Sequence, residues 1–164
     1  MSRTDVGDVA VSAFAEREHR DLDRGLDRIH LVASEMARRP TPELSSLVLG
    51  VLNWLHSTLD PHIAWEEAAA YPEIDIRAGT TWATRSARLE HRQIRARIAR
   101  IQRDWVSLHD AAHPDGRTEA QANLFALEAL LRAHLDTEEE LLIPVLAEAT
   151  AIEPDALAGS MAPG

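Results

Sequence analysis

Apolar residues recur at intervals of three and four over four long segments of the chain, which is the period of an α-helix. These segments cover residues 15–36, 48–66, 87–108 and 124–145. None of them alternates between apolar and polar residues as a β-strand would. Turn-forming residues separate them at 39–42, 71–79 and 109–116. Short connections between long amphipathic helices predict an all-α fold, an up-down-up-down antiparallel four-helix bundle.

Histidines interrupt all four apolar stripes, and glutamates interrupt two of them. Glu66 and Glu138 each follow a histidine by four residues; the histidines of the four stripes are His19, His62, His91 and His134. Residues four apart on a helix share a face, so each His-Glu pair points into the bundle. Counted from the predicted turns at about 1.5 Å per residue, the heights of these side chains agree to within about 5 Å. We therefore expect one buried layer of four imidazoles and two carboxylates.

A buried layer of this kind indicates a metal site, because a carboxylate inside an apolar core is costly unless it is paired or bound to a metal. Imidazole and carboxylate suit Fe, Mn, Zn or Cu. Six ligands exceed the four of a tetrahedral zinc site and suit two six-coordinate ions that share both glutamates. With an oxide or hydroxide as a further bridge, about one position on each ion stays open. The alternative is a hydrogen-bonded polar network, which would hold too few positive charges for its two carboxylates.

Composition narrows the function further. The chain has 164 residues, a net charge of −10 and no cysteine. The charge argues against a nucleic-acid partner, and the lack of cysteine excludes disulfides, thiolate sites and iron–sulfur clusters. We expect a cytoplasmic protein without a membrane partner, since no stretch resembles a membrane span or a secretory signal. We also expect flexible termini over residues 1–11 and 151–164, with the bundle formed by residues 12–150.

Four short motifs occur in a characteristic order over about residues 12–147: Glu18-His19-Arg20-Asp21-Leu22, then His62 with Glu66-Glu67 and Tyr71-Pro72, then Glu90-His91, then His134 with Glu138-Glu139 and Leu142-Ile143-Pro144. This pattern resembles the hemerythrin-like (HHE cation-binding) domain family. The resemblance implies a four-helix bundle with a non-haem di-iron centre, bridged by carboxylates and an oxide or hydroxide, for which zinc or manganese can substitute. The ligands it implies are His19, His62, Glu66, His91, His134 and Glu138.

Two positions depart from the oxygen-carrying hemerythrins. Those proteins have a second histidine four residues after the third-helix one, where this chain has Arg95. They place the fourth-helix carboxylate five residues after its histidine, which would be Glu139. On a straight helix Glu139 lies about 140° from His134 but Glu138 only about 40°, so we favour Glu138 as the ligand. A guanidinium at position 95 cannot coordinate in the usual way, but it can donate hydrogen bonds to an anion on an open metal position.

Two classes of function follow from these residues. Family members bind or sense dioxygen, nitric oxide or peroxide, or handle iron, and Arg95 favours reaction with peroxide, of catalase or peroxidase type, over oxygen carriage. The alternative is a non-enzymatic iron-binding or redox- or oxygen-sensing module that acts through a partner protein. Ferritin-type di-iron bundles need Glu-x-x-His on two helices, and here only Glu16 with His19 matches.

Several residues near the predicted layer carry expectations of their own. Pro61, directly before His62, predicts either a kink or a new helix that starts at Asp60-Pro61. Trp65 is placed to seal the site from solvent. His30, about 16 Å along its helix from His19, is expected in the core or at its boundary. His56 should face elsewhere, and His109 and His113 should be solvated in the third turn.

Overall fold

The structure is a computed structural model, and it describes residues 3–107 and 116–148. These residues form helices and no strand: α1 (Arg3–Glu35), α2 (Thr41–Trp54), α3 (Asp60–Trp65), α4 (Tyr71–Ala78), α5 (Arg85–Ser107), α6 (Gly116–Thr137) and α7 (Ile143–Glu148). Three π-helical turns join some of them end to end: η1 (Leu55–Leu59) links α2 to α3, η2 (Glu66–Ala70) links α3 to α4, and η3 (Glu138–Leu142) links α6 to α7. The described chain thus forms four long rods.

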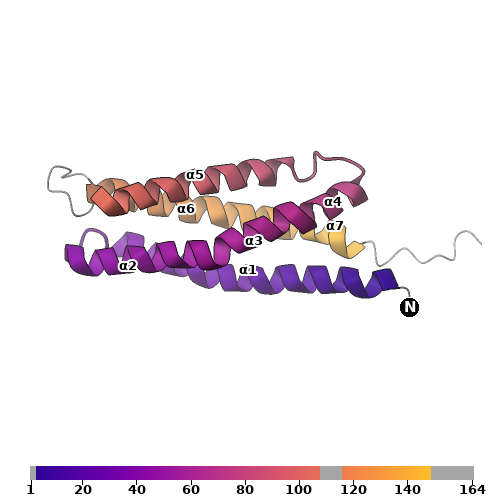
Figure 1. Cartoon of the computed structure of the whole chain (residues 1–164), viewed down its shortest axis with the longest axis horizontal. Coiled ribbons are helices and arrows are strands. Elements are labelled where there is room, and N and C mark those ends of the chain that lie inside the picture. The colour runs from indigo at the N-terminus through magenta and orange to yellow at the C-terminus, as the bar shows by residue number, and fades with distance from the viewer. Residues whose placement is uncertain (1–2, 108–115, 149–164) are drawn as a thin grey trace, which may run out of the picture.

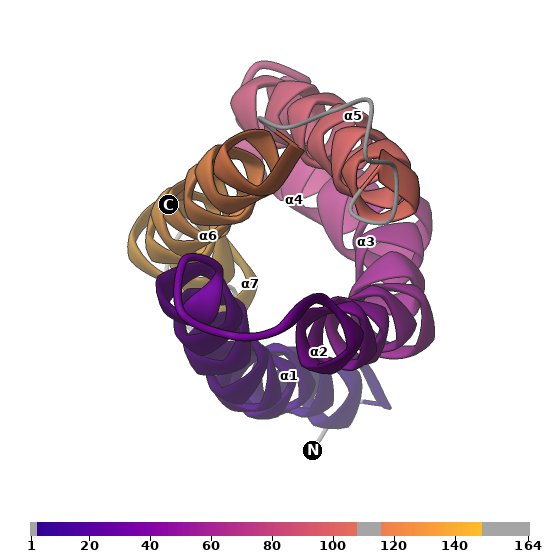
Figure 2. The ribbon, with the colours of Figure 1, turned by 90° about the vertical axis from the view of Figure 1, so that its left-hand side faces the viewer.

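The four rods run alternately up and down, as the spacing of apolar residues predicts (Figure 1). Viewed along the bundle, α1, the α2–α4 rod, α5 and the α6–α7 rod follow one another around the axis (Figure 2). Sequence neighbours pack together, and α6 closes the circle against α1. The predicted antiparallel four-helix bundle is confirmed.

The predicted helix boundaries hold in part. The first connection lies where expected, before α2 at Thr41. The second was expected to start at Tyr71-Pro72, and this is wrong: the rod stays helical to Ala78 and ends at Gly79, whose φ of 63° is left-handed. The third connection, with His109 and His113, lies outside the described residues, as does the tail over 151–164. The first helix begins at Arg3 and so extends through most of the segment 1–11 that we expected to be flexible.

The three π turns share a cause in the sequence. Each is followed by a dipeptide that ends in proline: Asp60-Pro61, Tyr71-Pro72 and Ile143-Pro144. Proline lacks a backbone N–H and its ring crowds the preceding helical turn. Widening that turn accommodates the ring, and the residue before each proline donates its N–H to the carbonyl five residues back. Asp60 therefore does not start a new helix: the rod runs through Pro61 with helical dihedral angles.

Each π turn also shifts which residues face the core. A turn with one extra residue advances the helix face by about 100°. The apolar stripe of the fourth rod predicts Leu141 and Val145 as core residues, but Leu141 is 64% exposed. Leu142, the last residue of η3, and Leu146 are the buried residues instead, and Val145 is partly buried beside them. The straight-helix period therefore fails just beyond Glu138, because the backbone there is not a straight α-helix.

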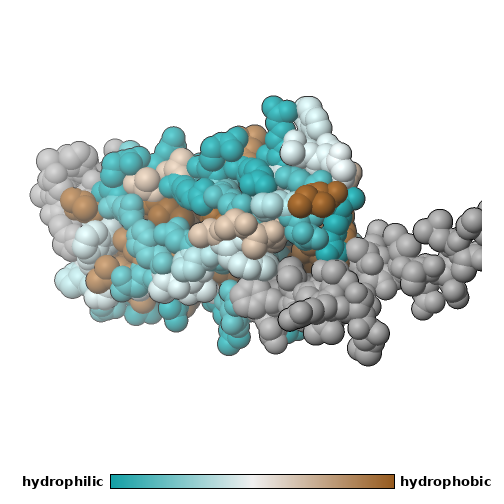
Figure 3. Space-filling view, turned by 45° about the vertical axis from the view of Figure 1, so that its right-hand side comes forward, coloured by the Kyte–Doolittle hydropathy of each residue, from teal (hydrophilic) through white to brown (hydrophobic). Residues whose placement is uncertain are grey.

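The core consists of two apolar clusters with a polar layer between them. The larger cluster includes Leu26, Leu55 and Leu127, and the smaller one, between α4, α5 and α7, includes Ile74 and Leu142. The surface in Figure 3 is mostly hydrophilic, with isolated apolar side chains. No helix in the described part of the chain is both long and apolar enough to span a membrane.

Candidate metal centre

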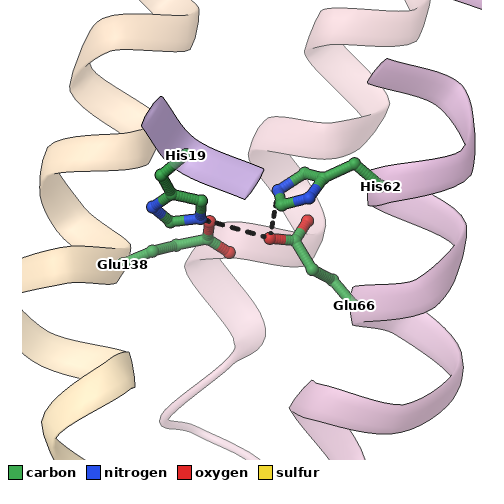
Figure 4. Close-up of side chains that lie close together, drawn as sticks. All are labelled: His19, His62, Glu66 and Glu138. Carbon is green, nitrogen blue, oxygen red and sulfur yellow. Dashed lines mark ion pairs between the residues drawn. The ribbon is translucent and has the colours of Figure 1, made fainter. Parts of the chain in front are cut away.

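Six buried polar side chains meet in the layer between the two apolar clusters. The structure brings together all six residues that the sequence singles out, and each is at most 3% exposed: His19, His62, Glu66, His91, His134 and Glu138. They form two groups of four in which every ligand atom lies within 4.8 Å of the others, and both groups contain Glu66 and Glu138. Figure 4 shows the first group, in which two imidazoles from α1 and α3 face the two carboxylates.

The separations between these atoms suit ligands of a metal. The Nε2 atom of His62 lies 2.7 Å from Glu66 Oε1, and the Nε2 atom of His91 lies 3.2 Å from Glu66 Oε2. Glu138 Oε2 lies 3.4 Å from His19 Nε2 and 3.6 Å from His134 Nε2. Two ligand atoms on a metal with bonds of about 2.1 Å are about 3.0 Å apart at a right angle and about 3.4 Å apart at a tetrahedral angle. Each carboxylate thus lies between imidazoles of both groups.

A second set of carboxylates lies outside the histidines, and three of these four carboxylates are hydrogen-bonded to a ring. The Nδ1 atom of each imidazole points away from the centre toward a glutamate of the neighbouring rod: Glu139 for His19 at 3.3 Å, Glu18 for His62 at 4.0 Å, Glu67 for His91 at 3.0 Å and Glu90 for His134 at 2.9 Å. We call these four residues the outer glutamates. Metal-binding histidines commonly donate their second N–H to such a carboxylate, which orients the ring.

Two of the outer glutamates direct the inner nitrogens of His91 and His134 at each other. Glu67 and Glu90 accept hydrogen bonds from Nδ1–H of His91 and His134. With both Nδ1–H groups directed outward, the two Nε2 atoms are the ring nitrogens left to bind at the centre. They lie 3.0 Å apart in a fully buried position. One cation shared by both atoms, a metal ion or a proton, would satisfy them.

Several buried atoms of the centre have no hydrogen-bond partner among the described residues. They are both ring nitrogens of His62, Glu66 Oε2 and Glu138 Oε2. His62 Nε2 is close to Glu66, but the contact does not have the geometry of a hydrogen bond. Unpaired polar atoms in a core are costly, and they are rare in folded proteins. The donor set and its unpaired atoms therefore fit a metal ion.

In the metal-free chain, a proton on an imidazole balances part of the negative charge of the buried carboxylates. Burial lowers the pKa of His19, but contacts with the carboxylates of Glu138 and Glu66 outweigh burial and raise that pKa to about 10. For Glu66, burial by itself raises the pKa, but hydrogen bonds with its histidine neighbours outweigh burial and bring this pKa well below the ordinary value. Without metal, the proton thus sits on an imidazole and the carboxylate stays charged.

Tyr71 belongs to the centre, although we expected it to begin a turn. Its side chain is buried, and its hydroxyl donates a hydrogen bond to Glu138 Oε1. The hydroxyl oxygen also lies 3.1 Å from His91 Nε2. Tyr71 follows Glu66 by five residues, which is about 140° on a regular helix. The π turn η2 brings both residues to the same face. The proline at position 72 was the available signal, because it accounts for the π turn.

A small cavity adjoins the centre on the side of the smaller apolar cluster. His19, Glu66, Glu138 and Tyr71 form its polar wall, and residues such as Ile74, Leu142 and Leu146 form its apolar wall. The space left for the centre of a water-sized molecule is about 10 Å³. That is about the room that one water molecule needs. Trp65 also lines this cavity, so it lies where we expected it to shield the site.

Arg95 lies outside the centre. Its guanidinium donates two hydrogen bonds to Glu67, at 2.9 and 3.0 Å, and its side chain is 43% exposed. The structure therefore does not place it over an open metal position. It reaches the centre only through Glu67, whose pKa it lowers, and His91.

The other histidines of the described chain are remote from the centre. His30 is exposed rather than in the core, although it is hydrogen-bonded to the largely buried Glu128. His56 is exposed and contacts Asp60 and Gln102, so it faces elsewhere as expected.

Comparison with known proteins agrees with this geometry. Residues 11–146 match the family described as hemerythrin HHE cation binding domain. This range contains every histidine and glutamate of the centre and most of the chain. Searches of curated proteins and of solved structures return no match. The chain therefore belongs to the hemerythrin HHE cation-binding family.

Proposed function

We propose that this chain is a di-iron protein that binds or reduces a small oxidant, namely peroxide, dioxygen or nitric oxide. The observation that carries the proposal is the pair of buried Nε2 atoms of His91 and His134, 3.0 Å apart, beside two buried carboxylates that both groups of ligands share. His19 and His62 would hold one ion and His91 and His134 the other, and Glu66 and Glu138, which belong to both groups, would supply the carboxylate ligands. Zinc or manganese would fill the same ligands where iron is scarce.

The cavity supports a small ligand. Its volume admits about one water-sized molecule and no organic substrate. Its apolar wall keeps bulk water away from Glu66 and Glu138. Two iron ions bound at the centre would supply the electrons that reduce an oxidant held there.

Tyr71 is the residue of this chain best placed to handle a proton. Burial, together with the nearby carboxylates of Glu138 and Glu66, raises the pKa of its hydroxyl, which therefore stays protonated. The hydroxyl oxygen lies at the cavity wall and donates to Glu138. It can hold a proton for a ligand in the cavity. Arg95 does not contact such a ligand in this arrangement and acts by positioning Glu67.

Metal content tests the first part of the proposal. Protein produced with adequate iron should contain about two iron ions per chain. His134→Ala should lower this content, whereas His30→Ala, a change at the exposed histidine, should not. One zinc ion and no iron under these conditions would contradict a di-iron centre.

Reaction with oxidants tests the second part. The iron-loaded protein should consume added hydrogen peroxide, or bind dioxygen or nitric oxide, faster than the chelator-treated protein. An iron-loaded protein that does none of these would favour the alternative, an iron-binding module that acts through a partner protein.

A further inference from the structure

The two halves of the centre hold their imidazoles differently. We call His91 and His134 the α5–α6 half and His19 and His62 the α1–α3 half; both halves share Glu66 and Glu138. The ligand types are the same in each half. The placement of the rings before a metal arrives is therefore one source of a difference in metal affinity between the halves.

The α5–α6 half is already arranged to bind. Both Nδ1 atoms are hydrogen-bonded to outer glutamates, at 3.0 Å to Glu67 and 2.9 Å to Glu90. The two Nε2 atoms lie 3.0 Å apart, which is the separation of two ligand atoms at a right angle on one metal. The ring centroids are 4.7 Å apart. A metal can enter this half with little movement of either ring.

The α1–α3 half is held more loosely. His62 Nδ1 lies 4.0 Å from Glu18, beyond hydrogen-bond distance, and has no hydrogen-bond partner among the described residues. His19 Nδ1 lies 3.3 Å from Glu139, whose side chain is 54% exposed. The two ring centroids are 5.3 Å apart. His19 also lines the cavity, which neither histidine of the α5–α6 half does.

We propose that the two metal positions fill in a fixed order, the α5–α6 half first and the α1–α3 half second. Loss of the outer partner of a metal-binding histidine typically costs about 10-fold to 100-fold in affinity, so a difference of that size is expected between the halves. The ion next to the cavity is then the weaker and more exchangeable one. This inference rests on the proposed two-metal centre.

The order of filling can be observed directly with zinc, which is diamagnetic and needs no exclusion of oxygen. Chelator-treated full-length protein with ¹⁵N-labelled histidine is titrated with Zn²⁺ and followed by NMR. At one equivalent, the ring nitrogens of His91 and His134 should show the shifts of metal-bound imidazole, and those of His19 and His62 should follow at the second equivalent. The opposite order, or four histidines that change together, would overturn the inference.

Two matched substitutions give an independent test. Glu67→Gln and Glu18→Gln each alter one outer glutamate, and both side chains are about one-third exposed, at 32% and 33%. Glu67→Gln should weaken the first zinc-binding step by about 10-fold or more, whereas Glu18→Gln should leave that step unchanged. Equal effects of the two substitutions would contradict unequal halves.

The same order can be read in reverse if the metal-free chain does not stay folded. Partial removal of metal from the loaded protein with a chelator should release the α1–α3 ion first. A total uptake below two ions per chain would refute the two-metal centre itself. Two ions bound in the opposite order would refute only the inference.

Discussion

In the metal-free protein, the stability of the bundle should fall as pH rises. A proton on His19 then takes the place of the metal beside the two carboxylates, and this proton is lost at high pH. The pKa of this imidazole rises from 6.5 to about 10 in the folded chain, where contacts with Glu138 and Glu66 outweigh the effect of burial. A group with a raised folded-state pKa contributes its full stability below the unfolded-state value, here 6.5, and loses it as pH rises to about 10. At about 1.36 kcal/mol per pKa unit, the largest possible loss is about 5 kcal/mol.

Urea unfolding of chelator-treated protein at several pH values between 6 and 10 measures this loss. We expect the free energy of unfolding to fall by a few kcal/mol over this range. His19→Gln should remove most of the pH dependence. His30→Gln, at an exposed position on the same helix, should keep it. The metal-loaded protein should change little, since the metal then occupies the place of the proton.

The reasoning would be refuted if His19→Gln retained the full pH dependence. In that case the proton that stabilises the metal-free centre would reside elsewhere. Stability that rises over the same pH range would also contradict it, because the sign follows from a pKa that is raised on folding.

Three further predictions follow from individual contacts. Gly25→Ala would place a Cβ atom 1.9 Å from the Trp54 ring, so it should destabilise the fold by about 1–3 kcal/mol in thermal unfolding. Gly50→Ala, which has open space around it, should instead stabilise helix α2 by about 0.5–1 kcal/mol in the same assay. Tyr71→Phe should keep both metal ions but slow peroxide consumption about 100-fold in stopped-flow assays, because a hydrogen-bond donor at the cavity wall is lost; an unchanged rate would exclude a role for the hydroxyl in the reaction. Arg95→Leu should keep its metal and change the free energy of unfolding by at most about 1 kcal/mol, because the ion pair is half-exposed; loss of metal would show instead that the centre depends on the Arg95–Glu67 pair.

The four rods and the six central residues could be predicted from sequence for one physical reason. A regular helix returns to the same face every three to four residues, so polar residues within the apolar stripe must meet inside the bundle. The prediction fails at Leu141 and Tyr71 because a fixed period assumes a regular backbone. Leu141 lies within the π turn η3 and Tyr71 directly follows η2, and the only trace of these turns in the sequence is the proline that follows each of them.

Arg95 shows a different limit. It lies one turn after His91, which places its backbone near the centre. A long side chain beside the apolar stripe can turn inward or toward a neighbouring helix, and helical spacing cannot decide between these directions. Here the carboxylate of Glu67 on the adjacent rod offers two good hydrogen bonds, and the guanidinium takes them.

The ring of outer glutamates has a consequence for the handedness of the bundle. In the rods that run in one direction the outer glutamate precedes a central residue, as Glu18 precedes His19; in the opposite rods it follows one, as Glu67 follows Glu66. Successive residues turn around the bundle axis in one sense on a helix that runs up and in the opposite sense on a helix that runs down. The change from preceding to following therefore cancels the change of helix direction, and all four glutamates point the same way around the axis. An apolar stripe alone fits bundles that turn to the left or to the right equally well. In the mirror arrangement each glutamate would point away from the histidine that it now faces, so this ring distinguishes one chirality of the fold from the other.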